Sequence, residues 1–159
     1  MSIKAGDKVP ASTFKVMSES GPAALTTAEL FSGKKVVLFS VPGAFTPTCS
    51  AKHLPGFVEH ADEFFARGVD TIACVAVNDV FVMHAWGKGA NASRITMLAD
   101  GNGEFARAVG LELDASGFGM GQRSQRFALI VNDGVVSKVF VENPGEFKVS
   151  SAEHVLSAL

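Results

Sequence analysis

The residue best suited to covalent chemistry in this sequence is a cysteine in the segment 42–49, which reads Pro-Gly-Ala-Phe-Thr-Pro-Thr-Cys. An apolar run precedes this segment and a helical pattern follows it, so Cys49 should lie in the first turn of a helix. Free backbone N–H groups and the positive end of the helix dipole stabilise a thiolate at such a position. The other cysteine, Cys74, lies in the apolar stretch 72–77, where burial should raise the pKa of its thiol. We expect only Cys49 to be reactive.

A lone reactive thiolate supports only some of the reactions known for cysteine. Exchange of the Cys-x-x-Cys type needs a partner three residues before Cys49, and that position is Thr46. A cysteine hydrolase needs a histidine general base, and His53, one turn further along the same helix, should point along the helix axis and not over the sulfur. Attack on the O–O bond of a peroxide requires less: a thiolate, donors for the leaving oxygen and a sheltered pocket. Peroxide chemistry is favoured, and a hydrolase stays open as an alternative.

Metal and nucleotide binding have weaker support. Cys49, His53 and His60 could be drawn as zinc ligands, but three groups on one helix without a second ligand cluster are a poor zinc signature. Solvated histidines are the simpler interpretation. The Gly-Asn-Gly at 101–103 has no acidic residue at the expected offset of about 20 residues, so it indicates a turn before a helix and not a dinucleotide site. We expect no cofactor and no metal.

The hydrophobic pattern predicts the elements that must position Cys49. The run 36–41 is continuously apolar, which is typical of a central strand buried on both faces. An apolar stripe of helical period covers 54–65, and Pro55 inside it predicts a kink near the second turn of the helix. Further strands are expected at 71–77 and 95–98, helices at 80–86, 103–109 and 151–159, and an antiparallel hairpin at 127–141 around Asn-Asp-Gly. The expected class is α/β, with a mixed central sheet flanked by helices on both faces.

Length and composition predict one soluble domain over residues 1–159. The chain is 47% hydrophobic and 19% charged, which suffices for a packed core. The formal net charge is -2 and no basic cluster exceeds two lysines, so neither nucleic acid nor a membrane is an expected partner. The first residues show no targeting pattern, and two cysteines do not make a disulfide framework. These features together predict a cytoplasmic protein with reduced thiols.

The pattern Pro42-x-x-x-Thr46-x-x-Cys49 resembles the active-site signature of the peroxiredoxins. The longer stretch 41–57 is similar in particular to the type II, or peroxiredoxin-five, subfamily. The similarity covers nearly the whole chain, and it includes the segments 77–79, 85–88, 98–101 and 123–129. The resemblance implies a thioredoxin-like fold and a thiol-dependent peroxidase that reduces hydrogen peroxide and alkyl hydroperoxides.

The resemblance also implies a role for each matching site residue. Cys49 would be the peroxidatic cysteine, Thr46 its hydroxyl partner, Pro42 a shield, and Arg126 the guanidinium beside the thiolate. Such donors are needed because ionisation alone does little. Lowering the pKa of any thiol from about 8.5 to about 6 increases the thiolate fraction about thirtyfold at pH 7, but the nucleophilicity falls about thirteenfold. Arg126 directly precedes the predicted strand 127–131, so it can point across the sheet toward the Cys49 loop.

The thiol that regenerates oxidised Cys49 is the main open question. Some relatives use a resolving cysteine near the C-terminus, but this chain has Val-Ser-Ser at 149–151 and no cysteine after Cys74. An external thiol, glutathione with glutaredoxin or thioredoxin, is therefore expected. Cys74 is a possible resolving thiol, although it would need local unfolding to reach Cys49. The resemblance further implies a homodimer. An alternative is a peroxide sensor or redox-regulated binding protein that uses the same cysteine.

Overall fold

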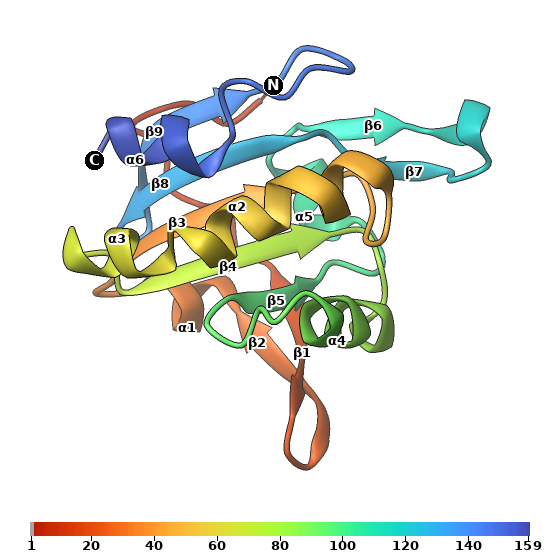
Figure 1. The fold of residues 1–159 in the computed structure, drawn as a ribbon, viewed down its shortest axis with the longest axis horizontal. Helices are drawn as coiled ribbons and strands as arrows, with labels where there is room; N and C mark the ends of the chain where they lie inside the picture. Colours follow the sequence, from red (N-terminus) through yellow and green to blue (C-terminus); the bar gives the residue numbers. More distant parts are fainter. Residues whose placement is uncertain (1) are drawn as a thin grey trace.

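The computed structural model describes residues 2–159 and shows a mixed sheet covered by helices on both faces (Figure 1). The main sheet has seven strands in the order β2-β1-β5-β4-β3-β8-β9. This confirms the expected α/β class. The strands are β1 (Thr13–Ser18), β2 (Gly21–Thr26), β3 (Lys35–Ser40), β4 (Thr71–Ala76), β5 (Thr96–Ala99), β8 (Phe127–Asn132) and β9 (Val135–Val141), and a separate pair is formed by β6 (Glu112–Asp114) and β7 (Gln122–Ser124).

The helices divide between the two faces of the sheet. Helices α2, α3, α4 and α6 share one apolar cluster with Val37 and Phe39 of β3, whereas α1 and α5 share the other with Val36 and Leu38. In Figure 1, α2 and α3 cross the front of β3 and β4. The helices are α1 (Thr27–Phe31), α2 (Leu54–Glu59), α3 (Ala61–Ala66), α4 (Val80–Gly89), α5 (Glu104–Ala108) and α6 (Ala152–Ser157), with a π-helical turn at Cys49–His53 and a 3-10 turn at Ser116–Phe118.

Strand β3 is the central strand that the apolar run at 36–41 predicts. It pairs in parallel with β4 and antiparallel with β8, and its residues from Val36 to Ser40 are fully buried. Successive side chains point to opposite faces of the sheet, so each face receives part of the run. Both faces are covered, which explains why the sequence shows no polar alternation here.

The predicted hairpin is also present. Strands β8 and β9 pair antiparallel with Asn132 opposite Val135, and Asp133 and Gly134 between them both have positive φ angles of 47° and 78°. Two consecutive residues of this kind form the tight turn that suits the twist of a hairpin, and Gly134 adopts that conformation without strain. The other predicted elements are present with ends that differ by a few residues.

The helix after Cys49 differs from the expectation. The π-helical turn at Cys49–His53 leads directly into α2, and Pro55 lies in the first turn of α2. The chain is interrupted a second time at His60, which separates α2 from α3. The predicted kink at Pro55 is thus replaced by a widened turn before the proline and a break after it. Proline removes a backbone donor, and a widened turn is one way a helix accommodates such a loss.

The N-terminal hairpin β1-β2 and helix α1 were not predicted from the pattern. Thr26 begins α1 with a capping box, in which its hydroxyl accepts from the N–H of Glu29 and the Glu29 carboxylate accepts from the N–H of Thr26. None of the residues of β2 is fully buried, and its exposed and half-buried positions differ little in hydrophobicity, so pairing with β1 decides its structure. None of the helices within residues 2–159 combines the length and apolar character needed to cross a membrane.

Helix α4 offers a test of this packing. Gly87 is buried, and a Cβ added there would lie 2.7 Å from Cγ of Met97 on β5, whereas a Cβ at exposed Gly89 meets nothing within 4 Å. We expect Gly87→Ala to destabilise the protein by about 1–2 kcal/mol through overpacking, and Gly89→Ala to stabilise it by about 0.5 kcal/mol through helix propensity. Urea denaturation of the matched pair checks this. Equal effects of the two substitutions would contradict the packing of α4 on β5.

Candidate active site

The segment that carries Cys49 leaves the end of β3 and turns back over the sheet. Backbone hydrogen bonds fix this loop: Ala44 N donates to Oδ1 of Asn78 at 2.9 Å, and Ser50 N donates to the carbonyl of Thr46 at 2.9 Å. The helical run begins at residue 47, so Cys49 lies in its first turn as predicted. The indole N–H of Trp86 on α4 donates to Oγ of Ser50 at 3.0 Å and ties this turn to the neighbouring helix.

Arg126 reaches the sulfur of Cys49. Its Nη2 donates to Sγ of Cys49 at 3.0 Å. The residue lies directly before β8, and in the β3-β8 register Phe127 pairs with Ser40. Antiparallel pairing therefore brings the start of β8 to the end of β3, the edge from which the Cys49 loop departs. The contact between Arg126 and Cys49 agrees with the expectation that Arg126 points across the sheet toward the Cys49 loop.

His53 is a further site residue, and the sequence interpretation of it was wrong. Its side chain is fully buried and not solvated. Nη1 of Arg126 donates to Nδ1 of His53 at 2.7 Å, and Nε2 of His53 donates to the carbonyl of Ser150 at 2.9 Å. The ring packs against Phe39 and Phe147, with centroid distances of 4.9 Å to each. The only sequence signal was its position four residues after Cys49, which in a helix places both on one face.

Burial and charge keep His53 neutral. Desolvation, reinforced by the nearby Arg126 charge and opposed by the hydrogen bond to Ser150, lowers the pKa of His53 from 6.5 to about 3. Both ring nitrogens are used, one as an acceptor and one as a donor. His53 is therefore free neither to bind zinc with Cys49 nor to act as the general base of a hydrolase, and both alternatives lose their candidate residue.

Pro42, Thr46 and Arg126 line a cavity of about 550 Å³, and Cys49 itself is not one of its lining residues. Oγ1 of Thr46 donates to the carbonyl of Gly43 at 2.7 Å, so this hydroxyl also closes the turn before Cys49. The Cys49 side chain is fully buried. Arg126 belongs to both surroundings, because it lines the cavity and contacts the sulfur.

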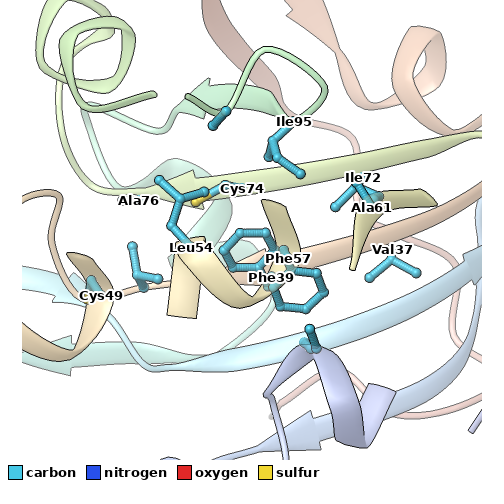
Figure 2. Packing of buried hydrophobic residues seen from close by; sticks show 14 of the residues in the cluster. Val37, Phe39, Cys49, Leu54, Phe57, Ala61, Ile72, Cys74, Ala76 and Ile95 are labelled. Atoms are coloured by element: carbon cyan, nitrogen blue, oxygen red, sulfur yellow. The ribbon is translucent and has the colours of Figure 1, made fainter. Parts of the chain in front are cut away.

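Cys74 lies on β4 in the same apolar cluster as Cys49 and Leu54 (Figure 2). It is fully buried, and desolvation is the main cause that raises the pKa of its thiol well above the ordinary value. The Cys49 sulfur raises that pKa further, while Arg126 lowers it. The predicted contrast between the two cysteines is confirmed for Cys74, which is a core thiol in this structure.

Comparisons with known proteins agree with this geometry. The family model described as Redoxin matches residues 4–156. Peroxiredoxin-2B of Arabidopsis thaliana is 51% identical over 161 residues, which cover 99% of this chain and 98% of that protein. The chain belongs to the Redoxin family. Its relatives in that family are peroxiredoxins, so the protein is a peroxidase that reduces peroxides with electrons from thiols.

Solved structures of other proteins have the same fold as this chain. The crystal structure of reduced Prx3 from Vibrio vulnificus in complex with hydrogen peroxide is 53% identical, with a TM-score of 0.96 and 98% of each chain covered. That of the Plasmodium falciparum antioxidant protein, a 1-Cys peroxiredoxin, is 33% identical, with a TM-score of 0.91 and 96% of each chain covered. The expected thioredoxin-like fold and the resemblance to peroxiredoxins are confirmed.

The low pKa of His53 predicts how the stability of this peroxiredoxin depends on pH. The unfolded chain binds the His53 proton near pH 6.5, whereas the folded chain binds it only near pH 3. His53 therefore contributes stability that is fully present above about pH 6.5 and is lost as the pH falls toward 3. We expect the free energy of unfolding of the wild type to fall about 1 kcal/mol per pH unit more steeply than that of His53→Gln between pH 6 and 4.

Urea denaturation of both proteins at several pH values measures this difference. His60, whose pKa is raised mainly by its hydrogen bond to Glu63, is present in both proteins and cancels in the comparison. Parallel curves for the two proteins would contradict a neutral buried His53.

Proposed function

We propose that Cys49 is the peroxidatic cysteine and that the protein reduces hydrogen peroxide and alkyl hydroperoxides through a sulfenic acid at this residue. The observation that carries the proposal is the 3.0 Å hydrogen bond from Nη2 of Arg126 to Sγ of Cys49. The thiolate attacks one peroxide oxygen, the O–O bond breaks, and the other oxygen leaves as water or an alcohol after it takes up a proton. Sulfur then carries the transferred OH group as a sulfenic acid.

The charges around the sulfur support this role. Among the ion pairs formed by residues 2–159, none involves Arg126, so its guanidinium lacks a carboxylate partner. A buried or half-buried charge needs an opposite charge, and the Cys49 thiolate supplies one. Arg126 also faces the cavity, where its remaining N–H groups can stabilise charge on the leaving oxygen. These are interactions that strengthen in the transition state.

Thr46 and Pro42 complete the proposed site. The Thr46 hydroxyl can accept a hydrogen bond from the O–H of the peroxide while it donates its own hydrogen to the carbonyl of Gly43, because a hydroxyl has one donor and two acceptor lone pairs. Pro42 has no N–H and presents an apolar ring to the cavity, which limits competition from water. Both residues therefore keep a structural role in the turn beside the functional one.

The size and lining of the cavity support organic peroxides as substrates. Its volume of about 550 Å³ is within the range of small-molecule pockets and far exceeds the share of about 30 Å³ that one water occupies in the liquid. Leu113, Ala115, Phe118 and Met120 give it an apolar wall. An alkyl group of a hydroperoxide can pack against this wall while the O–O group faces Arg126.

We propose that an external thiol, glutathione with glutaredoxin or thioredoxin, reduces the sulfenic acid. Cys74 is fully buried on the central sheet, and as a resolving thiol it would have to leave the core together with part of β4. Ser150 and Ser151 stand near the C-terminus, where some relatives carry a cysteine. The described similarity to a 1-Cys peroxiredoxin fits the same conclusion.

We also propose that residues 1–159 form one domain, that two copies assemble as a homodimer, and that the protein is located in the cytoplasm. Exposed Phe45, Phe81 and Phe118 are apolar surface that a second copy could cover. The two cysteines are both free, which fits a reducing compartment.

Substitution of the two cysteines separates their roles. We expect Cys49→Ser to abolish peroxide consumption with every reductant, because the nucleophile is lost. Cys74→Ser should keep most activity with glutathione and glutaredoxin, because Cys74 acts only in packing. Mass spectrometry after peroxide and glutathione treatment should find a glutathione adduct on Cys49 in both the wild type and Cys74→Ser.

A Cys49–Cys74 disulfide in the wild type would contradict the external route. Oxidation of only one equivalent of reductant per protein molecule would favour the alternative of a peroxide sensor over a catalyst.

Replacement of Arg126 tests its part in the chemical step. We expect Arg126→Lys to lower the second-order rate constant for hydrogen peroxide by about 100-fold, because an ammonium group cannot contact sulfur and the leaving oxygen in one plane. Alkylation of Cys49 by iodoacetamide, compared at the high-pH plateau of each protein, should change much less, because that reaction breaks no O–O bond. Stopped-flow measurements of both reactions check this, and an equal loss in both would contradict the proposed role.

A further inference from the structure

The structure contains a second cavity, which is separate from the one that Arg126 lines. Its volume is about 660 Å³, and neither Cys49 nor Arg126 is among its lining residues. Trp86 of α4, which bonds to Ser50 in the Cys49 turn, does not line it either. Helix α4 forms one side of the cavity with four residues whose spacing places them along one stripe of the helix: Val80, His84, Gly87 and Lys88.

The cavity lies where two neighbouring strands separate. Strand β1 pairs with β5 at one position, at which Lys15 lies opposite Ala99. If this antiparallel register continued, Met17 would lie opposite Met97, because partners move in opposite directions along the two strands. Both methionines line the cavity instead, and Figure 1 shows the β1-β2 hairpin projecting beyond β5 and α4. The opening between the diverging strands is thus part of the cavity.

One wall of the cavity is apolar and adaptable. Met17 and Met97 are half-buried there, and two buried residues of the adjoining apolar cluster complete the wall, Val80 and Ile95. A Cβ at Gly87 would lie 2.7 Å from Cγ of Met97, so Met97 lies directly against the backbone of α4. Methionine side chains are unbranched and flexible, so this wall can adjust to the shape of a ligand. It suits a flexible alkyl chain.

The polar part of the lining carries positive charge without a carboxylate to balance it. Lys88 and His84 are exposed and lie one turn apart on α4, and no Asp or Glu lines the cavity. None of the ion pairs among residues 2–159 includes either of them. The remaining polar side chains of the lining are neutral: Asn91, Ser93 and Thr96. An anion bound here would gain an attraction to Lys88 and hydrogen bonds from these neighbours.

We propose that this cavity binds a medium-chain fatty acid, with its alkyl chain between Met17 and Met97 and its carboxylate at Lys88. The volume is within the range of small-molecule pockets. One lysine matches the single charge of a carboxylate better than the charge of about -2 on a phosphate group. No Phe or Trp lines the cavity, so a nucleobase would find no ring to stack on. The inference goes beyond the proposed function, because this site contains neither the thiol nor the guanidinium that acts on peroxide.

The methionine methyl groups report directly on which cavity a ligand enters. Met17 and Met97 line this cavity, whereas Met120 lines the one beside Arg126. We expect a titration of methyl-¹³C-methionine protein with octanoate to shift the Met17 and Met97 signals saturably, with a midpoint of about 1 mM or lower. Met17→Leu and Met97→Leu assign the two signals. Octanoate that shifts only Met120, or that shifts no signal saturably, would overturn the proposal.

The place of the carboxylate is tested by removing one charge. Lys88→Met keeps the length of the side chain and a good helix former, and it should raise the octanoate midpoint about fivefold. The matched control is Lys138→Met on β9, which is exposed and does not line the cavity, and it should leave the midpoint unchanged. The neutral analogue 1-octanol should bind the wild type and Lys88→Met equally. Equal octanoate midpoints in the two lysine variants would overturn the assignment of the carboxylate to Lys88.

A blocking variant tests the cavity itself. Ser93 is exposed and lines the cavity, so Ser93→Trp should fill part of the space without disturbing the core and raise the octanoate midpoint more than about 10-fold. An unchanged midpoint in a variant with the melting temperature of the wild type would overturn the site. Cys49→Ser should lose peroxide consumption and keep octanoate binding. Failure of this inference is therefore distinct from failure of the proposed function, and loss of octanoate binding in Cys49→Ser would contradict a separate site.

Discussion

The structure of the site depends on one guanidinium group with two neighbours. Arg126 donates to the Cys49 sulfur with one terminal nitrogen and to the His53 ring with the other. The guanidinium is positively charged, and no carboxylate among the described residues lies within ion-pair distance of it. Burial, reinforced by this charge, keeps His53 neutral. Arg126 therefore contacts the sulfur and also contributes to the neutral state of the histidine ring beside it.

The sheet brings these groups together from distant parts of the chain. Cys49 and Arg126 are 77 residues apart, and the antiparallel pairing of β3 with β8 places them at one edge. The carboxyl end of β3 supplies the loop with the cysteine, while the amino end of β8 supplies the arginine. Segment 148–150, beyond β9, then closes the back of the site through Ser150. Three sequence regions share one small polar network inside an apolar cluster.

The polar network also explains how the site tolerates burial. Cys49, His53 and Ser150 are fully buried, and Glu142 nearly so. Unpaired polar groups in such surroundings are costly, but here the hydrogen-bond chain satisfies both His53 nitrogens and one oxygen of Glu142 accepts three donors. A satisfied network of this kind specifies one arrangement of its members. It therefore favours one fixed arrangement of Arg126, His53 and the Cys49 sulfur.

The central strand, the hairpin at β8-β9 and the core position of Cys74 could be predicted from the sequence, because hydrophobic period, turn residues and local polarity act over a few neighbouring residues. The sequence also placed Cys49 in the first turn of a helix. The burial of His53, the carboxylate of Glu142 under the 148–150 segment and the break at His60 were decided only by the tertiary structure. A histidine four residues from a cysteine looks the same in a sequence whether solvent or a distant arginine surrounds it, and only the packing of β8 and the C-terminal segment makes that choice.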